Sequence, residues 1–318
     1  MRRALLVAAL AGLGSWGAFA QFSGSTGSLV RLEGGIVVDE DTVRTAREVE
    51  SHSSGGDTPV WVNPRGFEKD VFTFTRVVFK TGLRNGVNYS RQSLMGMGIG
   101  PRFSWWVDFP DADLNFSYRL QQMTSTRVDP DGRVLKLTDP ELFEQPFIYM
   151  EHPGYMLLKD DEVTALRKYL RNGGVLYIND FWSAIEWTGF ETEMQRVLPG
   201  ENWVDLPLSH PIFNCVFPLE GPMKKLQVPT MQFWNPAHNN DDPSSPPLQT
   251  VYRGEGSDEM HIRAWLDEKQ RIRVIAIHNC DLSDGWEREG ENPDYFHTFS
   301  EKISYPLGIN IIFYVMTH

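Results

Sequence analysis

Cysteine is scarce in this chain of 318 residues, and its scarcity excludes several kinds of site. Only Cys215 and Cys280 are present, and they form neither a Cys-x-x-Cys pair nor a Cys/His cluster at zinc spacing. The sequence therefore predicts no zinc centre. Both cysteines lie in apolar stretches, so two buried thiols and, in an oxidising compartment, a disulfide remain as alternatives.

Basic residues are also few. Thirty Lys and Arg stand against 42 Asp and Glu, which gives a formal net charge of −12. Loss of the first twenty residues would remove Arg2 and Arg3 and make the charge still more negative. Binding of nucleic acid or of an anionic lipid surface needs clustered positive charge. The composition therefore argues against both kinds of partner.

Motifs of nucleophilic and cofactor chemistry are missing as well. No Gly-x-Ser-x-Gly sequence, which would place a serine on a nucleophile elbow, occurs in the chain. Gly96, Gly98 and Gly100 form a glycine-rich run, but this run precedes Pro101 and opens no helix, which argues against a dinucleotide site. We therefore predict no cofactor.

The N-terminus has the three parts of a secretory signal. Arg2 and Arg3 are followed by an uncharged stretch over residues 4–20 that ends in Ala18-Phe19-Ala20. We predict cleavage after Ala20 and a periplasmic or secreted protein, with no stable membrane span once the signal is removed. The alternative is an uncleaved anchor, but the stretch is short and glycine-rich beside the roughly 20 apolar residues that a membrane-spanning helix needs.

After residue 20 the composition changes twice. Residues 21–65 are rich in Ser, Gly, Thr and charge, which is typical of a flexible linker. Residues 66–318 alternate strand-like and helix-like segments, and we assign them to a single α/β domain. We expect helices over residues 112–123, 160–172, 184–197 and 303–316, and strands over residues 71–79, 147–150, 175–178 and 272–277. This alternation predicts a mostly parallel sheet with helices on both faces.

Polar residues gather where the apolar segments end. In parallel sheets, ligands bind beyond the carboxyl ends of the strands. Four apolar runs are each followed by acids, amides or histidines, namely Asp108, Glu151, His152, Asn179, Asp180, His278, Asn279, Asp281 and Asp284. Such side chains transfer protons and hold cations. The alternative role is the capping of turns and helices, which favours Asp and Asn at the same places.

Residues 278–284 are the densest of these polar runs, yet their spacing matches no calcium loop or zinc motif, so no metal site is predicted. His152, which precedes Pro153, is interpreted as a loop residue rather than a ligand. The ten tryptophans add aromatic faces near the predicted loops, and such faces beside carboxylates suit sugar rings. Packing in the core is the alternative role for most of them.

Several motifs resemble, in order, those of the bacterial family known as domain of unknown function 4159. They are residues 103–116 (FSWWVDFPDADLNF), 166–174 (LRKYLRNGG), 179–182 (NDFW), 210–213 (HPIF), 278–287 (HNCDLSDGWE) and 308–311 (GINI). The first motif adds Trp106, Asp111 and Asn115 to the candidate ligand-binding residues.

This resemblance implies a flavodoxin-like fold, similar to that of class I glutamine amidotransferases and of trehalose-utilisation proteins. In amidotransferases the turn after the corresponding strand carries a catalytic cysteine, whereas here it reads Asn179-Asp180-Phe181. The lack of a thiol argues against glutamine hydrolysis, because a carboxylate cannot replace a thiolate without a change of mechanism. The resemblance implies no established activity.

Three hypotheses of function follow. The first is a non-catalytic ligand-binding or interaction module of the cell envelope, for a carbohydrate or another envelope component. The second is a hydrolase acting on a glycan or related envelope substrate, in which Asp180 or Asp281 and His278 act as acid and base, with or without a divalent cation. The third is a subunit that binds a protein partner and no small ligand.

Overall fold

The computed structural model describes residues 29–32, 36–49, 58–67, 70–82 and 105–318. The predicted signal over residues 1–20 and the glycine-rich run over residues 96–100 lie outside the described residues.

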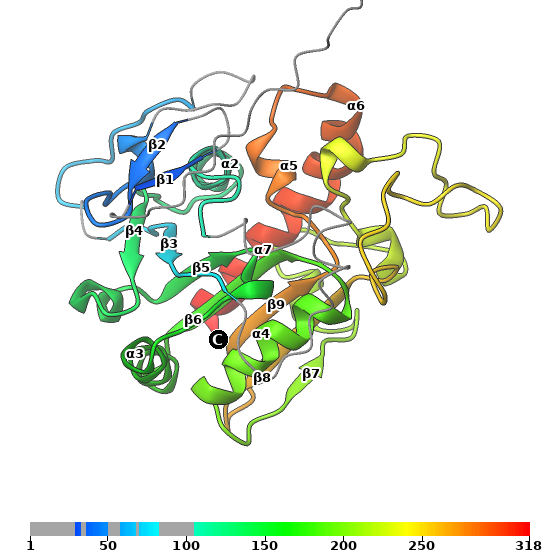
Figure 1. Ribbon diagram of the computed structural model, residues 1–318. Helices are drawn as coiled ribbons and strands as arrows, with labels where there is room; N and C mark the ends of the chain where they lie inside the picture. Colours follow the sequence, from blue (N-terminus) through cyan, green and yellow to red (C-terminus); the bar gives the residue numbers. More distant parts are fainter. Residues whose placement is uncertain (1–28, 33–35, 50–57, 68–69, 83–104) are drawn as a thin grey trace, which may run out of the picture.

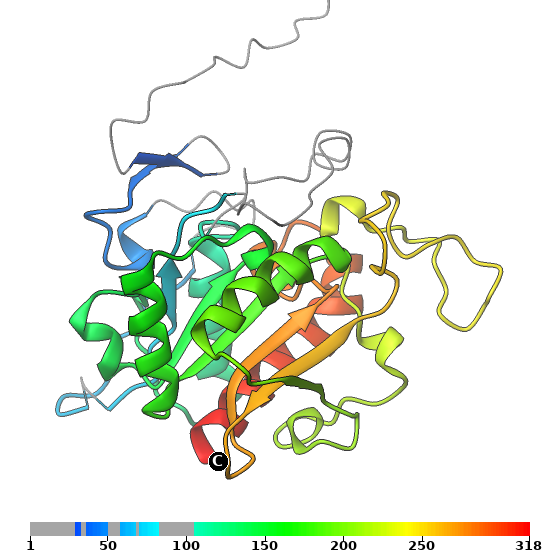
Figure 2. The same ribbon diagram turned by 60° about the horizontal axis from the view of Figure 1, so that its bottom comes forward.

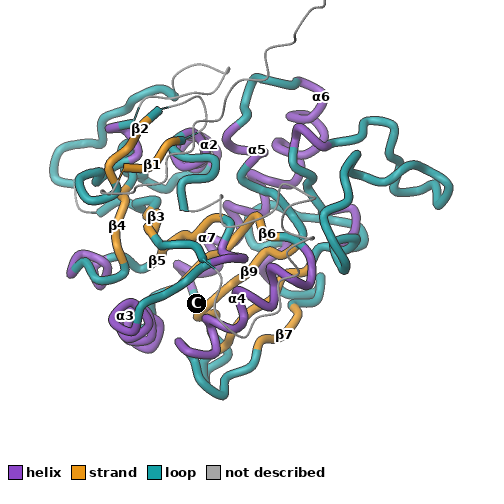
Figure 3. The backbone as a smooth tube through the Cα atoms, in the orientation of Figure 1, coloured by secondary structure: helices purple, strands orange, loops and turns teal. Residues whose placement is uncertain are grey.

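A seven-stranded sheet forms the centre of the protein (Figures 1 and 3). Its strands lie in the order β4-β3-β5-β6-β9-β8-β7; the pairs from β4 to β9 are parallel, and β8 and β7 continue the sheet as antiparallel strands. The strands are β3 (Thr75–Val78), β4 (Arg133–Lys136), β5 (Phe147–Glu151), β6 (Val175–Phe181), β7 (Trp203–Asp205), β8 (His261–Leu266) and β9 (Ile272–His278). The predicted mostly parallel α/β sheet is confirmed, whereas its antiparallel edge was not predicted.

Helices cover both faces of this sheet (Figures 1 and 2). They are α2 (Asp111–Met123), α3 (Asp160–Arg171), α4 (Ser183–Val197), the short α5 (Asp284–Glu287) and α6 (Pro293–Tyr295), a π-helix over Phe296–Ser304, and α7 (Tyr305–Thr317). Single 3-10 turns lie at Ala46–Glu48, Pro140–Glu144, Pro153–Tyr155, Pro211–Phe213, Met223–Leu226 and Met231–Phe233. The helices α3 and α4 lie on one face, and α2 and α7 on the other.

Two hydrophobic cores arise because side chains alternate across each strand. In β5, Phe147 and Tyr149 pack with α2 and α7, while Ile148 and Met150 pack with α3 and α4. All four side chains are buried. Strands buried on both faces read as continuous apolar runs in the sequence, which is why β5, β6 and β9 were predicted correctly.

The helix α3 forms where its local signals agree. Three acids open it, the Glu162 carboxylate accepts a hydrogen bond from the backbone N–H of Lys159, and Val163 and Leu166 face the core. It ends before Gly173, whose φ of +98° is the left-handed conformation that terminates helices. The prediction for residues 160–172 is confirmed to within one residue.

Part of the predicted linker is folded. The strands β1 (Leu29–Arg31) and β2 (Val37–Asp39) pair with each other, and Val43 and Ala46 are buried in the core that α3 and α4 also share. The backbone N–H of Ala46 donates to the carbonyl of Asp131. The prediction of a flexible linker therefore does not hold for residues 29–32 and 36–49, because a few apolar residues in a polar segment bury against the sheet.

Three smaller expectations also change. The apolar run at 105–107, which precedes Asp108 and was interpreted like the apolar runs that form strands, forms turns. The strand predicted over residues 71–79 is reduced to Thr75–Val78. Both cysteines are free, and Cys280 is buried while Cys215 is exposed, so the alternative of two buried thiols holds for only one of them.

A fully buried arginine joins β3 to α2 and to the turns before it. Arg76 donates from Nε to both carboxylate oxygens of Asp113 at 3.0 Å. Its Nη1 donates to the backbone carbonyls of Trp105 and Val107 at 2.7 and 2.8 Å. One side chain therefore fixes the start of α2 and the turn that precedes it.

We expect Arg76→Met to lower the free energy of unfolding by about 3 to 5 kcal/mol, because Asp113 would remain buried and unpaired. The double variant Arg76→Met with Asp113→Leu recovers part of the loss, and the remainder reflects the two backbone carbonyls. Urea unfolding measures both. The control Arg271→Met removes an ion pair to Asp267 from an arginine that is 50% exposed, and it should cost about 0 to 1 kcal/mol. Equal losses for Arg76→Met and the control would contradict this account.

Candidate functional site

The segments that follow β3, β5, β6 and β9 meet at one edge of the sheet and enclose a cavity of about 520 Å³. The cavity is lined in part by Trp106, Asp108, His152, Asp180, Asp281 and Asp284. β3 and β5 are neighbours in the sheet, and the chain passes from β3 to β4 on one side before it returns to β5 on the other. The cavity therefore lies where ligands bind in open α/β sheets, beyond the carboxyl ends of strands at a point where the strand order reverses.

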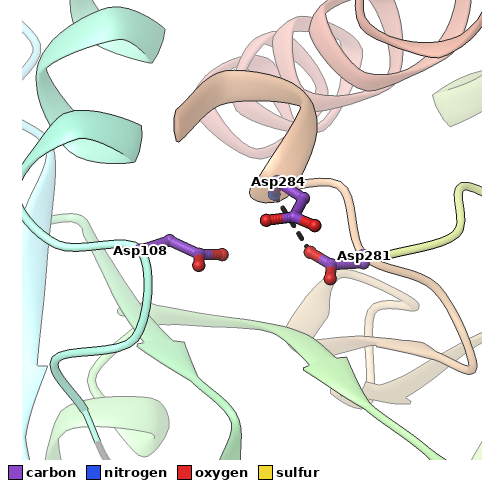
Figure 4. Close-up of side chains that lie close together, drawn as sticks. All are labelled: Asp108, Asp281 and Asp284. Carbon is purple, nitrogen blue, oxygen red and sulfur yellow. Dashed lines mark hydrogen bonds between the residues drawn. The ribbon is translucent and has the colours of Figure 1, made fainter. Parts of the chain in front are cut away.

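Five buried carboxylates converge at this cavity. Oxygen atoms of Asp108, Asp281 and Asp284 lie within 4.8 Å of one another, and so do oxygen atoms of Asp108, Glu151 and Asp180. Asp108 belongs to both groups. Figure 4 shows the Asp108 side chain pointing from the loop before α2 toward Asp281 and Asp284, which lie on the segment that follows β9 and enters α5 at Asp284. Within that segment the backbone N–H of Asp284 donates to Oδ1 of Asp281 at 3.0 Å.

This crowding makes most of the carboxyl groups hold their protons more tightly. Burial, and then the charges of Asp281 and Asp180, raise the pKa of Asp108 well above its ordinary value. Burial and the charge of Asp108 do the same to the pKa of Glu151, as burial and Asp180 do to that of Asp281. Burial and Asp108 raise the pKa of Asp284 to about 7.

Asp180 is the exception among the five. Its burial favours the protonated form, but the hydrogen bond and charge of His152 outweigh this and lower the pKa of Asp180 below its ordinary value. The Oδ2 atom of Asp180 lies 3.2 Å from Nδ1 of His152, and its Oδ1 accepts from Nε1 of Trp182 at 2.8 Å. Nη2 of Arg253 lies 4.0 Å from the same Oδ1. Asp180 is therefore the carboxylate held in its ionised form.

His152 is paired with two acids. Its Nδ1 faces Asp180, and its Nε2 lies 3.9 Å from Oε1 of Glu186. Burial lowers the pKa of His152, but the charge of Glu186 and the hydrogen bond to Asp180 outweigh it, so the net pKa is raised above its ordinary value. The raised pKa favours the protonated ring, and a histidine that carries this proton can act as a general acid.

The capping alternative for Asp180 is excluded by the contacts. The residue before α4 is Trp182, and its side chain makes no capping hydrogen bond. Its backbone N–H donates instead to the Glu186 carboxylate at 2.7 Å. No side-chain cap is made to α2 either, where Asp108 had been the candidate.

Strained backbone collects at the same edge. Asp108, His152, Asp180, Ser183 and Asn279 have φ between 48° and 69° although none is a glycine. Among the described residues, Gln270 in the turn between β8 and β9 is the one other non-glycine in this region. Each such conformation costs about 1 to 3 kcal/mol, and such strain is found preferentially at functional sites.

The structure separates His278 from this cavity. Its Nε2 donates to the backbone carbonyl of Ser183 at 3.0 Å, and Nη1 of Arg263 lies 3.2 Å from its Nδ1. Its ring packs against Phe181 and Trp187. Burial, aided by the charge of Arg263, lowers its pKa to about 3. His278 is thus held neutral in the core, and the histidine beside Asp180 is His152, which the sequence had assigned to a loop.

The remaining candidate residues do not line the cavity, and most of them hydrogen-bond to segments around it. Asn115 donates to the carbonyl of Trp286 at 2.8 Å, Asn179 to Oγ of Ser283 at 2.9 Å, and Asn279 to the carbonyls of Gly256 and Glu259. Glu151 accepts from Ser283 at 2.9 Å, and it also bonds Tyr149. Asp111 is buried at the start of α2. Of the candidate ligand-binding residues, Trp106, Asp108, Asp281 and Asp284 line the cavity.

Two arginines, a threonine and a phenylalanine also line the cavity and were not predicted. Nε of Arg288 donates to Oδ1 of Asp284 at 3.0 Å, and the four-residue spacing between them on a helix was the available signal. Thr230 donates to Oδ2 of Asp281 at 2.7 Å. Arg253 stacks over the rings of Trp182 and Phe233. Thr230, Phe233 and Arg253 come from the long connection between β7 and β8, where no local pattern marks them.

The fold and the cavity define an α/β domain with an acidic site at the carboxyl edge of its sheet. The chain belongs to the family described as domain of unknown function DUF4159, whose model matches residues 99–316. The family inferred from the sequence motifs is thereby confirmed. No curated protein matches the chain. Within the described segments, none of the helices combines the length and the apolar character that a membrane crossing requires.

The environment of His278 predicts a specific dependence of stability on pH. Because its folded pKa of about 3 lies below the ordinary value of about 6.5, its neutral form is favoured in the fold. Stability is therefore complete above the ordinary pKa and is lost as the pH falls toward the folded pKa, with a slope of at most about 1.4 kcal/mol per pH unit.

We expect His278→Gln to remove this part of the acid sensitivity, while its amide can still donate to Ser183. Urea unfolding of the wild type and the variant over this pH range gives the two slopes. His297→Gln, at a side chain that is 68% exposed, is the matched control and should leave the slope unchanged. A wild-type slope in His278→Gln would show that the ring does not titrate in this way.

Proposed function

We propose that this protein is a ligand-binding module that holds a polar, hydroxyl-rich molecule, such as a carbohydrate of the cell envelope, in the cavity at the carboxyl edge of its sheet. The observation that carries the proposal is the lining of that cavity. An ionised Asp180 and Arg253 stand near the half-buried aromatic rings of Trp106 and Phe233. Carboxylates and guanidinium groups bond hydroxyls, and aromatic faces cover the apolar face of a sugar ring.

The size and place of the cavity support the same proposal. A volume of about 520 Å³ falls within the range of roughly 300 to 1,000 Å³ that small-molecule sites occupy. The predicted signal over residues 1–20 supports an exported protein, in the periplasm or outside the cell, where such molecules are present.

We further propose that the domain is flavodoxin-like and related in fold to class I glutamine amidotransferases. The parallel strands support this: in order of the chain they lie second, first, third, fourth and fifth across the sheet, which is the flavodoxin-like order. Asp180 supports it too, because its φ of 48° marks a sharp turn from strand to helix, where a nucleophile stands in other α/β enzymes. The carboxylate at this turn favours binding over glutamine hydrolysis.

A panel of envelope glycans and their component sugars tests the proposed function. A ligand at about a hundred times its dissociation constant should add close to 3 kcal/mol of stability, which appears as a higher melting temperature. Asp180→Asn and Trp106→Ala should each weaken binding at least about tenfold, equivalent to about 1.4 kcal/mol. Phe143→Ala changes an exposed aromatic on the connection that leads into the amino end of β5 and should leave binding unaltered. If no ligand stabilises the wild type, the proposed function is wrong.

A second candidate function is hydrolysis of such a glycan, and the pair of His152 and Asp180 favours it. The raised pKa of His152 favours the protonated ring that a general acid needs, and Asp180 orients this ring through its 3.2 Å contact with Nδ1. This version replaces the earlier hypothesis that used His278, because His152 lines the cavity and His278 does not.

If the protein hydrolyses a glycan, His152→Gln should lower the turnover number about a hundredfold or more, the usual contribution of a general acid. His278→Gln should retain most of the activity, because His278 does not line the cavity. Release of reducing sugar measures both rates. The opposite ranking of the two variants would restore the original assignment, and equal turnover in wild type and His152→Gln would exclude His152 as the acid.

A further inference from the structure

We propose that Asp108, Asp281 and Asp284 form a binding site for one divalent cation at the floor of the cavity. The three residues come from two distant parts of the chain, the loop before α2 and the segment that follows β9 and enters α5 at Asp284. One carboxylate oxygen from each lies within 4.8 Å of the others. The inference goes beyond the proposed function, since the cation would bind without any organic ligand.

The Oδ2 atom of Asp108 is the observation that points to a ligand. The residue is 8% exposed, and this oxygen makes no hydrogen bond to any part of the chain that the structure describes. Its side chain points at Asp281 and Asp284 in Figure 4. A buried carboxylate oxygen without a partner is costly, and a bound cation would satisfy it.

The arginines near the three carboxylates do not pair with all of them. Arg288 is engaged with Asp284 at 3.0 Å, and Arg253 lies nearer to Asp180, 4.0 Å from its Oδ1. Among the described residues, neither Asp108 nor Asp281 forms an ion pair within 4.0 Å with a basic side chain. Of the three carboxylates, that of Asp284 is therefore the one with a guanidinium within 4.0 Å among the described residues.

The donor set selects the class of cation. All three candidate ligands are carboxylate oxygens, and the cavity beyond them can supply water. Hard divalent ions such as Mg²⁺, Ca²⁺ and Mn²⁺ prefer oxygen ligands of this kind. Zn²⁺ is disfavoured because no thiolate or imidazole belongs to the group. The sequence pattern had predicted no metal, since the ligands do not follow the spacing of a calcium loop.

The test uses the full chain, freed of metal with a chelator and titrated calorimetrically with Mg²⁺, Ca²⁺ and Mn²⁺, each alone. We expect one ion per chain for at least one of the three and a higher melting temperature in its presence. Asp108→Asn and Asp281→Asn should each weaken binding at least tenfold. Both amides are close in shape to the carboxylates, and circular dichroism of the variants checks that they fold.

Asp258→Asn removes an exposed carboxylate and is the matched control, which should bind like the wild type. Absence of binding by all three ions, or equal binding in the two cavity variants and the wild type, would overturn the inference. Equal weakening by Asp258→Asn would also overturn it, because it would indicate a general effect of net charge. Glycan binding without cation binding would refute this inference and leave the proposed function standing. Cation binding without glycan binding would support this inference and refute the proposed function.

Discussion

The buried guanidinium of Arg76 is the interaction on which the arrangement of the site depends. It carries its charge from the middle of β3 to Asp113 in α2, and it also binds the carbonyls of the turn at Trp105 and Val107. Asp108 follows that turn directly. A lysine could not serve here, because only the planar fork of arginine reaches a carboxylate and two carbonyls at once. The ring of Tyr149 in β5 lies against the same guanidinium, with its centroid 5.1 Å from the central carbon.

Buried carboxylates this close together repel one another when they are ionised, so the surrounding structure has to hold them in place. The contact between α2 and α5, which begins with Asp284, does so. Asn115 donates to the carbonyl of Trp286, and the rings of Phe116 and Trp286 lie 4.6 Å apart. Gly308 of α7 packs so closely on these two rings that an added Cβ would lie 2.6 Å from Phe116 and 2.8 Å from Trp286. Dense packing therefore opposes the electrostatic repulsion.

Much of the fold followed from local patterns, and the limits of those patterns are physical. The amphipathic helix α3 and the apolar strands β5, β6 and β9 were predictable because each carries its own signal in consecutive residues. The carboxylates Asp108, Asp180, Asp281 and Asp284 were predictable as a set, since parallel strands end at one edge. The choice between His152 and His278 was not predictable. His152 follows β5 and His278 ends β9, and only the tertiary contacts show that His152 joins Asp180 while His278 enters the core.

The connection between β7 and β8 supplies part of the cavity wall, although it lies outside the parallel part of the sheet. It is the source of Thr230, Phe233 and Arg253 in the cavity wall, yet it joins two antiparallel strands at the far edge of the sheet. The acids lie at or beyond the carboxyl ends of the parallel strands, while part of the cavity wall comes from this connection. Substitutions at Phe233 or Arg253 can therefore alter what the cavity accepts. Other residues of the same connection tie it to the acids and to the fold, because Thr230 donates to Asp281 and Val228 is buried in a core.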